Sequence, residues 1–501
     1  MTSILGLSLT SANLPAIAAA GQVAVPDYDR DDLVAGIVHL GVGAFHRAHQ
    51  AVAVDRLLSA GLGRDFAICG IGILPSDKRM AGVLADQDGL YTLVIKHADG
   101  SREPRVIGSI VDYVFAPDDP AAAIERMARP EVRIVSMTVT EGGYNYDQVT
   151  GEFVADDPGI RHDLANPHAP TTIFGYLVAA LKLRRDRGIA PFTVMSCDNI
   201  QGNGHVTRRM LVAYARLDSA EFAAWLDSAV HFPNSMVDRI TPVTTDADRA
   251  EVTGRFGVED AWPVVAEPFF QWVLEDDFGT GRPPWEEAGV QVVSEVEPYE
   301  LMKLRLLNAS HQAMAYFGYL AGHRYAHEAA QDPAIASLLT RYMAEEATPT
   351  LRPVPGVDLA GYQRTLIERF SNPEVRDTLA RLCAETSDRI PKWLLPVVRE
   401  NLAAGRPVTL SAAVCASWAR YAEGVDEQGA PVEVVDRLAG RVTAAARRYA
   451  DDPIAFLRDP QLFGQLADEP AFRTPYLATL DSLHQRGSAA TLAELTGLCG
   501  R

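Results

Sequence analysis

The sequence has few cysteines, and their arrangement excludes a zinc ribbon or a disulfide framework. The five cysteines among 501 residues form no Cys-x-x-Cys pair and lie far apart: Cys69, Cys197, Cys383, Cys415 and Cys499. An odd and scattered set of this kind is typical of a reducing compartment. We therefore expect a cytoplasmic protein that needs no covalent crosslink or metal for its stability.

Long apolar runs and an excess of basic residues are also missing. No stretch approaches the roughly 18 consecutive apolar residues of a membrane helix, and no Lys or Arg precedes the first apolar stretch, as it would in a signal peptide. The 46 basic and 65 acidic residues leave a net charge of −19, which repels phosphate backbones and anionic bilayers. We expect neither nucleic acid nor a membrane surface as a partner.

The residues that are present predict a globular α/β protein, with 48% hydrophobic and 22% charged residues. In the first half, strand-like runs alternate with helical patterns, and Asp99-Gly100 between two β-rich runs indicates a hairpin turn. This alternation predicts a largely parallel, doubly wound, Rossmann-like sheet. The strand-like runs are 37–40, 66–71, 90–96, 105–115, 132–139 and 192–196, and helical patterns follow at 44–58 and 171–187.

The second half is predicted to be mostly helical. From Pro298 onward the pattern has helical periodicity and almost no β-branched runs, with breaks expected at 353–356 and 389–391. The segment 279–284, Gly-Thr-Gly-Arg-Pro-Pro, is the best linker candidate. We therefore predict a nucleotide-binding domain over residues 1–285 and an all-α substrate and catalytic domain over residues 286–501.

A glycine turn follows the first predicted strand. The segment from Gly41 to Arg47, Gly-Val-Gly-Ala-Phe-His-Arg, begins the Gly-x-Gly-x-x-Gly dinucleotide fingerprint but lacks its third glycine. The first glycine permits a tight turn, and the second lets a pyrophosphate approach the backbone at a helix N-terminus. A turn that serves packing alone is the alternative. The predicted cofactor contacts in this segment are Gly41, Gly43, Phe45, His46 and Arg47.

The acidic residue that meets the ribose is expected just after the second strand. Asp77 has this place, whereas Asp65 precedes that strand. A carboxylate there accepts a hydrogen bond from the ribose 2′-hydroxyl and so favours NAD. Lys78 and Arg79 follow directly and suit a 2′-phosphate, which keeps NADP as the alternative.

Four polar residues share one side of an otherwise apolar helical segment. At 100° per residue, Glu300, Lys303, Asn308 and His311 lie within one 140° arc, while leucine and methionine cover the rest. A helix that is apolar all round is buried, so the polar arc is expected to face a cavity or an internal partner. Burial lowers the pKa of a lysine, which favours Lys303 as a general base. An internal Glu300–Lys303 pair beside a core histidine is the alternative.

Asn199 ends another predicted strand, in Ser-Cys-Asp-Asn. Ligands of open α/β sheets bind beyond the carboxyl ends of the strands. Asn199 is therefore a candidate donor to a substrate oxygen, with a turn asparagine as the alternative.

Together these features resemble the polyol-specific long-chain dehydrogenases, a family that includes mannitol 2-dehydrogenases, fructuronate reductases and arabinitol dehydrogenases. The resemblance covers nearly the whole chain. Its markers are Gly41-Val-Gly-Ala-Phe-His-Arg-Ala-His49, Asp88-Gly-Leu-Tyr91, Thr138-Val-Thr-Glu-Gly-Gly-Tyr144, Cys197-Asp-Asn-Ile-Gln-Gly-Asn-Gly204, Val237-Asp-Arg-Ile-Thr-Pro242, Lys303-x5-Asn308-x2-His311, Arg369-Phe-Ser-Asn-Pro373 and Arg389-Ile-Pro-Lys392.

The resemblance implies zinc-independent, NAD(P)-dependent oxidation of a polyol or reduction of a ketose, with D-mannitol and D-fructose as the leading pair. It implies that Lys303 is the general acid/base, that Asn199 and Asn308 hold the reacting oxygen, that His311 orients the substrate and that Glu300 relays the proton. It further implies that Asp238, Arg381 and Arg389 contact substrate hydroxyls. The base and the cofactor would come from different domains, with the site at the cleft between them.

Three other readings stay open at this stage. A uronate reductase of the same family would need an added cation for the substrate carboxylate, which Arg381 or Arg389 could supply. A non-catalytic sensor of nucleotide and sugar would not require the base. A metal-dependent alcohol dehydrogenase would lose activity on chelation. Monomer and homodimer are both compatible with the sequence.

Overall fold

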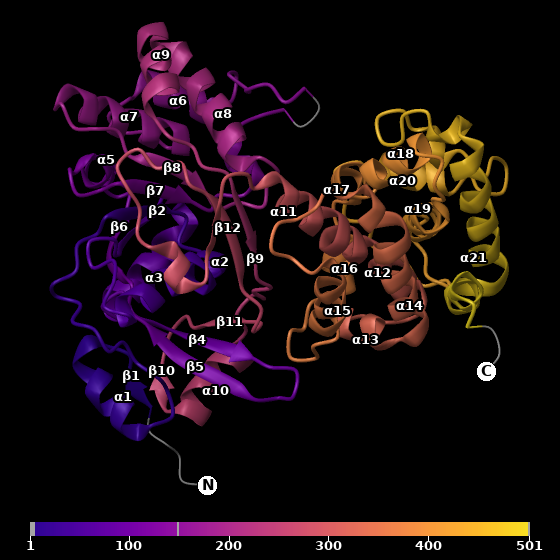
Figure 1. Cartoon of the computed structure of the whole chain (residues 1–501), viewed down its shortest axis with the longest axis horizontal. Coiled ribbons are helices and arrows are strands. Elements are labelled where there is room, and N and C mark those ends of the chain that lie inside the picture. The colour runs from indigo at the N-terminus through magenta and orange to yellow at the C-terminus, as the bar shows by residue number, and fades with distance from the viewer. Residues whose placement is uncertain (1–5, 148–149, 499–501) are drawn as a thin grey trace. The chain divides into compact units, whose positions relative to one another are not determined.

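The chain, seen here as a computed structural model, is described over residues 6–147 and 150–498 (Figure 1). It divides into two compact units, Met1–Glu297 and Pro298–Arg501, and each unit has its own buried apolar residues. The four described cysteines are buried and free of disulfides. Cys499 lies outside the described residues.

A five-stranded parallel sheet forms the centre of the first unit. Its strand order is β6-β3-β2-β7-β8, with every neighbouring pair parallel. The chain moves from β2 outward in one direction and then in the other, so the switch point lies beside β2, where such sheets bind ligands. The predicted Rossmann-like, doubly wound sheet is confirmed. The strands are β2 (Ile37–Leu40), β3 (Ile68–Gly72), β6 (Ile110–Phe115), β7 (Ile134–Met137) and β8 (Thr193–Ser196).

Both faces of this sheet are buried under helices. Alternate side chains of a strand point to opposite faces, so one strand contributes to two cores. Val38 and Leu40 of β2 belong to a core closed by α5, α7, α8 and α9, whereas Ile37 belongs to a core closed by α3 and α4. The predicted helix 44–58 is divided into α2 and α3, because His49 between them leaves helical dihedral angles (φ −125°, ψ −89°). The helices of this unit are α1 (Leu14–Ala20), α2 (Ala44–Ala48), α3 (Gln50–Ser59), α4 (Lys78–Asp86), α5 (Pro120–Ala128), α6 (Pro158–Ala165), α7 (Ile173–Asp186), α8 (Asn203–Asp218), α9 (Ala220–Ala229) and α10 (Asp246–Phe256).

The predicted hairpin is present. β4 (Tyr91–Lys96) and β5 (Arg102–Ile107) pair antiparallel around Asp99-Gly100, and β11 (Val264–Ala266) adds to the other edge of β4. The predicted β-rich run 105–115 is not one strand, because the chain leaves β5 at residue 107 and enters the parallel sheet as β6. A two-stranded parallel pair, β1 (Leu7–Ser8) and β10 (Val258–Glu259), completes this end of the unit.

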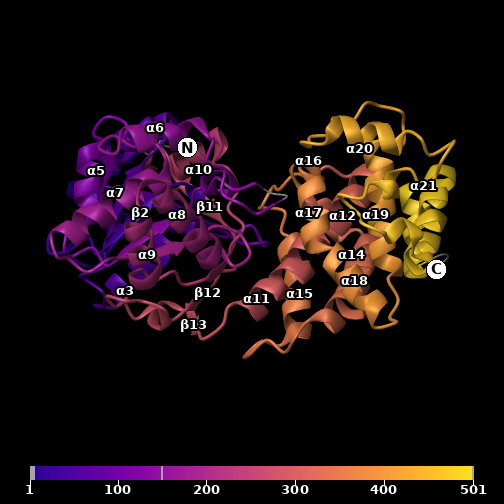
Figure 2. The ribbon, with the colours of Figure 1, turned by 90° about the horizontal axis from the view of Figure 1, so that it is seen from above.

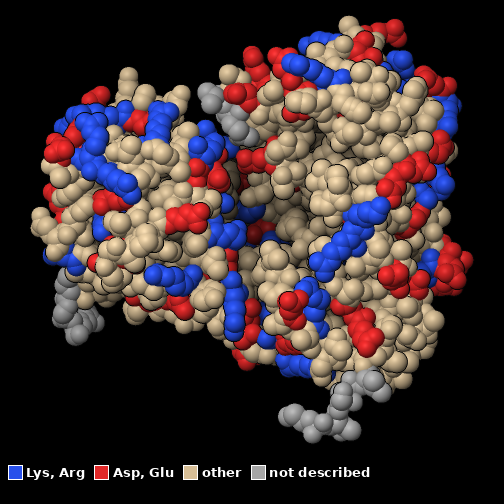
Figure 3. All heavy atoms as spheres, turned by 180° about the vertical axis from the view of Figure 1, so that it is seen from behind, with Lys and Arg blue, Asp and Glu red and all other residues tan. Residues whose placement is uncertain are grey.

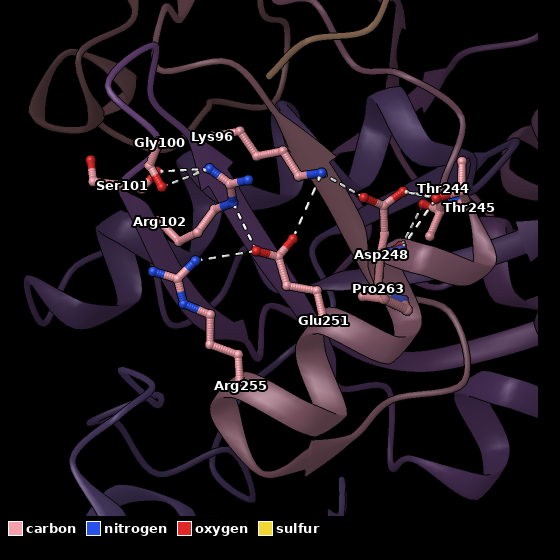
Figure 4. A network of polar contacts seen from close by, with 10 residues as sticks. All are labelled: Lys96, Gly100, Ser101, Arg102, Thr244, Thr245, Asp248, Glu251, Arg255 and Pro263. Carbon is pink, nitrogen blue, oxygen red and sulfur yellow. Dashed lines mark hydrogen bonds and ion pairs between the residues drawn. The ribbon is translucent and has the colours of Figure 1, made fainter. Parts of the chain in front are cut away.

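Charged side chains fasten the hairpin to α10, as Figure 4 shows. Lys96 Nζ lies 2.5 Å from Asp248 Oδ1, and Arg102 Nε donates to Glu251 Oε1 at 3.0 Å. Arg255, one turn further along α10, reaches the same Glu251 carboxylate. Because Lys96 and Asp248 are shielded from water, their attraction is screened less than that of the exposed pairs elsewhere on the surface.

The segment 279–284, expected to be the linker, lies within the first unit. It connects β12 (Gln271–Glu275) to β13 (Gln291–Val293), which pair in parallel, while β9 (Ser235–Asp238) pairs antiparallel with β12. Arg282 in this segment contacts the carboxylates of Asp276 and Glu286. The chain thus returns to a sheet after residue 284 and before the division at Glu297.

The second unit is helical, as predicted, and α12 lies at its centre. Figure 2 shows α12 surrounded by α14, α16 and α19, each of which it contacts. α19 presents small buried residues such as Ala412, Ala416 and Ala419, which permit close helix packing. The helices are α11 (Glu297–Met302), α12 (Ala309–Leu320), α13 (Ala326–Gln331), α14 (Pro333–Arg341), α15 (Leu359–Phe370), α16 (Leu379–Cys383), α17 (Thr386–Trp393), α18 (Leu395–Ala403), α19 (Thr409–Ala422), α20 (Ala439–Ala446) and α21 (Pro470–Thr496).

Two features of this unit differ from the sequence prediction. The break expected at 353–356 is present as a loop. The break expected at 389–391 is not, because Pro391 lies inside α17 and the helix ends two residues later. Two stretches also have π-helical geometry, with backbone bonds from residue i+5 to residue i. The first π segment is Lys303–Asn308 and the second is Tyr342–Ala347.

Charges of both signs mix closely over the face drawn in Figure 3. Many charged side chains of the described residues pair locally, as Arg187 does with Glu125 and Arg208 with Asp227. Among the helices of the described residues, none combines the length and the apolarity that crossing a bilayer requires.

Candidate active site

The glycine turn between β2 and α2 has the geometry that dinucleotide binding requires. Gly41 has φ +89°, and a Cβ on it would lie 2.3 Å from the Thr138 carbonyl oxygen, so no other residue fits. A Cβ on Gly43 would meet nothing closer than the Gly41 oxygen at 4.0 Å. The first glycine is therefore required by the fold, whereas the second leaves its surface open for a close ligand. The residues present fit a dinucleotide.

His46 has the place of the third glycine of the fingerprint, which normally permits close packing of helix on strand. Its ring stacks on that of His39 from β2, with centroids 3.5 Å apart and planes 15° apart. Flat stacking keeps helix and strand close without a glycine. Burial lowers the pKa of His39 to about 3 and holds the pKa of His46 well below its usual value, so both rings are neutral.

Polar groups of β7 and of the residue that follows it hold His39 in turn. The Ser136 hydroxyl lies 2.8 Å from His39 Nδ1 and donates to Gln50 Oε1 at 2.9 Å. The Thr138 hydroxyl lies 2.9 Å from His39 Nε2 and donates to the Gly41 carbonyl at 2.8 Å. The glycine turn therefore rests on a buried polar layer that the sequence analysis did not identify.

Phe45 and Arg47 of the turn differ in exposure. Phe45 is half-buried and stacks on His49 at 4.8 Å. Arg47 is only 1% exposed, and its Nη1 donates to the Trp262 carbonyl at 2.5 Å, while its own carbonyl accepts from Tyr91 at 2.6 Å. Its guanidinium thus supports the turn from inside the fold and does not reach its surface.

Asp77 follows β3, at the predicted place. Its Oδ2 accepts from the backbone N–H of Ile73 at 3.0 Å and of Leu74 at 2.9 Å, which fixes the loop. The two neighbouring cations have other partners: Lys78 Nζ lies 3.3 Å from Asp118, and the Arg79 guanidinium lies 4.3 Å from the Trp262 ring centre.

A second group of residues lies at the carboxyl ends of β7 and β8. Asn199, the candidate donor, is exposed there. The buried carboxylate of Asp198 accepts from the N–H of Val139 and of Thr140, both at 2.9 Å, and from the Tyr144 hydroxyl at 2.7 Å. Burial raises the pKa of Asp198. Asp198 ties the loop after β7 to the loop after β8, and its place next to Asn199 was the available sequence signal.

In the second unit, Glu300, Lys303, Asn308 and His311 are carried by one continuous helical segment, on α11, the first π segment and α12. The first three are only 5–6% exposed. Nδ2 of Asn308 is buried and has no hydrogen-bond partner within residues 6–147 and 150–498. The His311 ring lies 4.5 Å from Phe370 of α15, tilted by 44°. Phe370 belongs to the marker segment 369–373, for which the sequence analysis assigned no contact.

Three predicted substrate contacts lie elsewhere. Asp238 ends β9 in the first unit and is 5% exposed. In the second unit, Arg381 makes a two-pronged contact with Asp377, and Nη1 of Arg389 donates to the carbonyls of Arg381 and Leu382 at 3.2 and 3.0 Å. Both guanidinium groups already have partners within this unit.

The fold and the site residues define a dinucleotide-binding α/β unit followed by a helical unit with a buried lysine and asparagine. Comparison with known proteins gives the family. The model of the mannitol dehydrogenase Rossmann domain matches residues 35–287, and the model of the mannitol dehydrogenase C-terminal domain matches residues 295–484. The chain belongs to the mannitol dehydrogenase family.

Individual relatives are similar over most of their length. A mannitol 2-dehydrogenase of Phaeosphaeria nodorum is 47% identical over 97% of this chain and 85% of its own. The structure of Pseudomonas fluorescens mannitol 2-dehydrogenase in ternary complex with NAD and D-mannitol is 45% identical, with a TM-score of 0.87 over 98% of this chain and 100% of its own. A D-sorbitol dehydrogenase in substrate-free form is 37% identical, with a TM-score of 0.88 over 94% and 97%.

Proposed function

We propose that this chain is an NAD-dependent dehydrogenase that interconverts D-mannitol and D-fructose without a metal ion. The observation that carries the proposal is that the buried Nδ2 of Asn308 lacks a hydrogen-bond partner in the described chain. Asn308 lies in the same π segment as Lys303. A buried donor without a partner costs about 1–3 kcal/mol, so it suits an oxygen that arrives with a ligand. The similarity to an enzyme solved with NAD and D-mannitol supports this substrate and cofactor.

In the proposed reaction, Lys303 Nζ takes the proton of the substrate hydroxyl, and Glu300, three residues earlier, passes it on. NAD, when bound, accepts the hydride from the carbon that bears this hydroxyl. Asn308 and Asn199 donate N–H groups to the oxygen as negative charge develops on it, and His311, held against Phe370, orients the substrate. Loss of one such donor typically costs about 3–4 kcal/mol of transition-state stabilisation.

For the cofactor, we propose that the backbone at Gly41 and Gly43 receives the pyrophosphate and that Asp77 accepts from the ribose hydroxyl. Phe45, His46 and Arg47 belong to this binding segment. The side chains of His46 and Arg47 support it from its buried side. Lys78 and Arg79 already have partners and are therefore less available to the 2′-phosphate of NADP. This favours NAD as the cofactor.

For the substrate, we propose that Asp238, Arg381 and Arg389 contact its hydroxyl groups. Arg381 is neutralised by Asp377, and Arg389 donates to two backbone carbonyls. The charge of Arg381 is therefore balanced by Asp377, and Nη1 of Arg389 is already engaged by two neutral carbonyls, so neither guanidinium group is fully available for a two-pronged contact with a uronate carboxylate. This favours a neutral polyol or ketose over fructuronate or tagaturonate.

A substrate panel tests the proposal. Oxidation of mannitol, sorbitol and arabinitol, and reduction of fructose and fructuronate, are followed at the absorbance of reduced nicotinamide, each with both cofactors. We expect the highest kcat/KM for mannitol and fructose with NAD(H). Sorbitol is the second candidate because a D-sorbitol dehydrogenase is 37% identical. A higher kcat/KM for fructuronate than for fructose would refute the substrate assignment.

Lys303→Ala separates catalysis from ligand sensing. Its kcat should fall roughly 10²–10⁴-fold, the usual contribution of a general base, while NADH affinity, measured by fluorescence titration, is retained. Turnover near the wild-type rate in this variant would remove Lys303 from the mechanism. Chelator treatment should leave kcat unchanged, and a loss that zinc restores would instead establish the metal-dependent alternative.

We also propose a cytoplasmic location, because the four described cysteines are buried as free thiols. A fluorescent fusion imaged in the source cell tests the location. Whether the enzyme is a monomer or a homodimer is measured by light scattering after gel filtration.

A further inference from the structure

The first π segment brings its two proposed catalytic groups closer together than a regular helix would. Five residues of α-helix turn by 500°, which leaves Lys303 and Asn308 about 140° apart around the axis. In this segment the backbone bond runs from the Ala309 N–H to the Leu304 carbonyl, five residues apart. This wider turn reduces the angle per residue, so residues five apart approach the same side of the helix.

A π turn is rare and is less favourable than the α-helix around it, so its persistence requires support. The support converges on Arg305, which lies between Lys303 and Asn308. The Arg305 carbonyl accepts a hydrogen bond from the Tyr342 hydroxyl at 3.1 Å. Tyr342 is fully buried and belongs to the second π segment, which packs against the first.

The side chain of Arg305 makes a second set of contacts that holds the first π segment in place. Its Nη1 and Nη2 donate to the two carboxylate oxygens of Glu400 at 2.8 and 2.6 Å, and Nη1 also donates to the Thr350 carbonyl at 2.7 Å. A two-pronged arginine–carboxylate pair fixes orientation as well as distance. Arg305 is 6% exposed, so its guanidinium is shielded from water, whereas the Glu400 carboxylate on α18 is half-exposed.

The second π segment, which carries Tyr342, is itself anchored by hydrogen bonds. In the second π segment the Thr348 N–H bonds to the Met343 carbonyl, again five residues apart. The buried Glu346 carboxylate accepts from the N–H of Leu410 at 2.7 Å and of Ser411 at 2.9 Å, which anchors this segment on α19. Tyr342 therefore approaches Arg305 from a fixed place.

We propose that Tyr342 and the Arg305–Glu400 pair are positioning residues for the reaction: they hold the first π segment so that Lys303 and Asn308 act on one substrate oxygen. This inference rests on the proposed roles of Lys303 and Asn308. It goes further in assigning the geometry of the pair to groups that touch neither substrate nor cofactor. A displacement of about 1 Å at a reacting centre can lower the rate by a factor on the order of 10².

Tyr342→Phe keeps the buried ring and removes only the hydroxyl, and Glu400→Gln keeps the size of a half-exposed side chain and removes its charge. We expect each to lower kcat for mannitol at least tenfold, with KM and NADH affinity within threefold of wild type. The primary deuterium isotope effect on kcat should rise, because hydride transfer becomes more rate-limiting. Tyr449→Phe is the matched control, since it removes a hydroxyl that donates to Asp481 of α21 and to neither π segment, and it should keep wild-type kcat.

A double-mutant comparison distinguishes this inference from the proposed function. If Tyr342 acts through Lys303, then Tyr342→Phe has no further effect on the residual rate of Lys303→Ala, so the two losses do not multiply. Near wild-type turnover in Lys303→Ala would refute the proposed function itself. A strong loss in Lys303→Ala together with kcat within threefold of wild type in both Tyr342→Phe and Glu400→Gln would refute the positioning role alone. If Tyr342→Phe lowers both kcat and the melting temperature, its loss of kcat counts as structural. The kcat of Glu400→Gln then decides whether the positioning role holds.

Discussion

The glycine turn of the first unit and the first π segment of the second unit are built in opposite ways. At residues 41–47 the surface offered to a ligand is backbone, and the side chains of His46 and Arg47 are buried beneath it. In the π segment the backbone is covered, and the groups proposed to meet the ligand are the side chains of Lys303 and Asn308. The first arrangement suits a phosphate, which any correctly shaped backbone can bind, and the second suits a single reacting oxygen.

The two regions have one property in common, which is a buried layer that fixes each of them. The His39–His46 stack, held by Ser136 and Thr138, lies under the glycine turn. Arg305, held by Glu400 and Tyr342, fixes the π segment. Substitutions should therefore separate the regions by what they damage: cofactor affinity at the turn and the chemical step at the π segment.

After Lys303→Ala, the largest effect is expected at Asn308. Asn308→Ala removes a donor to the developing negative charge and should lower kcat roughly 10²–10³-fold, measured with saturating mannitol and NAD⁺. NADH affinity should stay within twofold of wild type. The exposed Asn166→Ala in the first unit is the control. A variant that lost NADH affinity instead of kcat would break the division of labour between the two regions.

Gly41→Ala should damage the other region. The Cβ would lie 2.3 Å from the Thr138 oxygen at φ +89°, and strain of this kind costs about 1–3 kcal/mol before the clash is counted. We expect NAD⁺ affinity to fall at least tenfold and the melting temperature of the first unit to fall as well. Gly82→Ala in α4 is the matched control, because its Cβ would meet nothing within 4 Å. Equal losses in both variants would contradict the argument from the turn.

Acid should lower the free energy of unfolding, because His39 under the glycine turn is neutral in the folded state. The pKa of His39 is lowered to about 3 in the folded state, against about 6.5 in an unfolded chain. The stability from neutral His39 is therefore complete above pH 6.5 and is lost as the pH falls from there toward 3, because the unfolded chain binds the proton first. At about 1.4 kcal/mol per pH unit, the loss reaches about 2 kcal/mol at pH 5.

Urea unfolding of the full chain at pH 7, 6 and 5 measures this loss. The unfolding free energy should decrease across the series, and His39→Gln should flatten the decrease. The exposed His168→Gln should leave it unchanged. A slope that His39→Gln does not alter would place the acid sensitivity elsewhere in the fold.

The smallest effect is expected at Asp77, where side chain and backbone both contribute. Asp77→Ala removes the proposed acceptor for the ribose hydroxyl and the cap on the N–H groups of Ile73 and Leu74. We expect about a tenfold loss of NAD⁺ affinity, which corresponds to about 1.4 kcal/mol, and a smaller loss for NADP⁺. Asp118→Asn, which releases only Lys78, should keep wild-type NAD⁺ affinity. An unchanged ratio of the two affinities in Asp77→Ala would remove Asp77 from cofactor selection.

Much of the fold could be predicted because its signals are local. Buried β-rich runs and a glycine turn gave the parallel sheet and the place of Gly41, and the polar residues at 300–311 gave the candidate site. The prediction was wrong where strand pairing divides one run between two sheets and where a proline is accepted within a helix. The run 105–115 is divided between two sheets, and Pro391 is tolerated inside α17.

Other features lay outside what periodicity can reveal. The angle between Lys303 and Asn308 was calculated for an α-helix, and no local pattern distinguishes a π turn from the helix around it. The partners that hold the turn and the π segment are likewise separated from them in sequence, as Ser136 is from His39 and Glu400 from Arg305.

The amino-acid sequence by itself determined the order of strands and helices and the chemical kinds of the polar groups, since both follow from residue type and from spacing along one element. Only the tertiary structure decided which of those groups stay without a partner, which are neutralised by a neighbour and how far the helix at 303–308 is widened. The contacts that fix the glycine turn and the π segment join residues that lie tens to hundreds of positions apart, such as His39 and Ser136 or Arg305 and Glu400, which the folded core brings together.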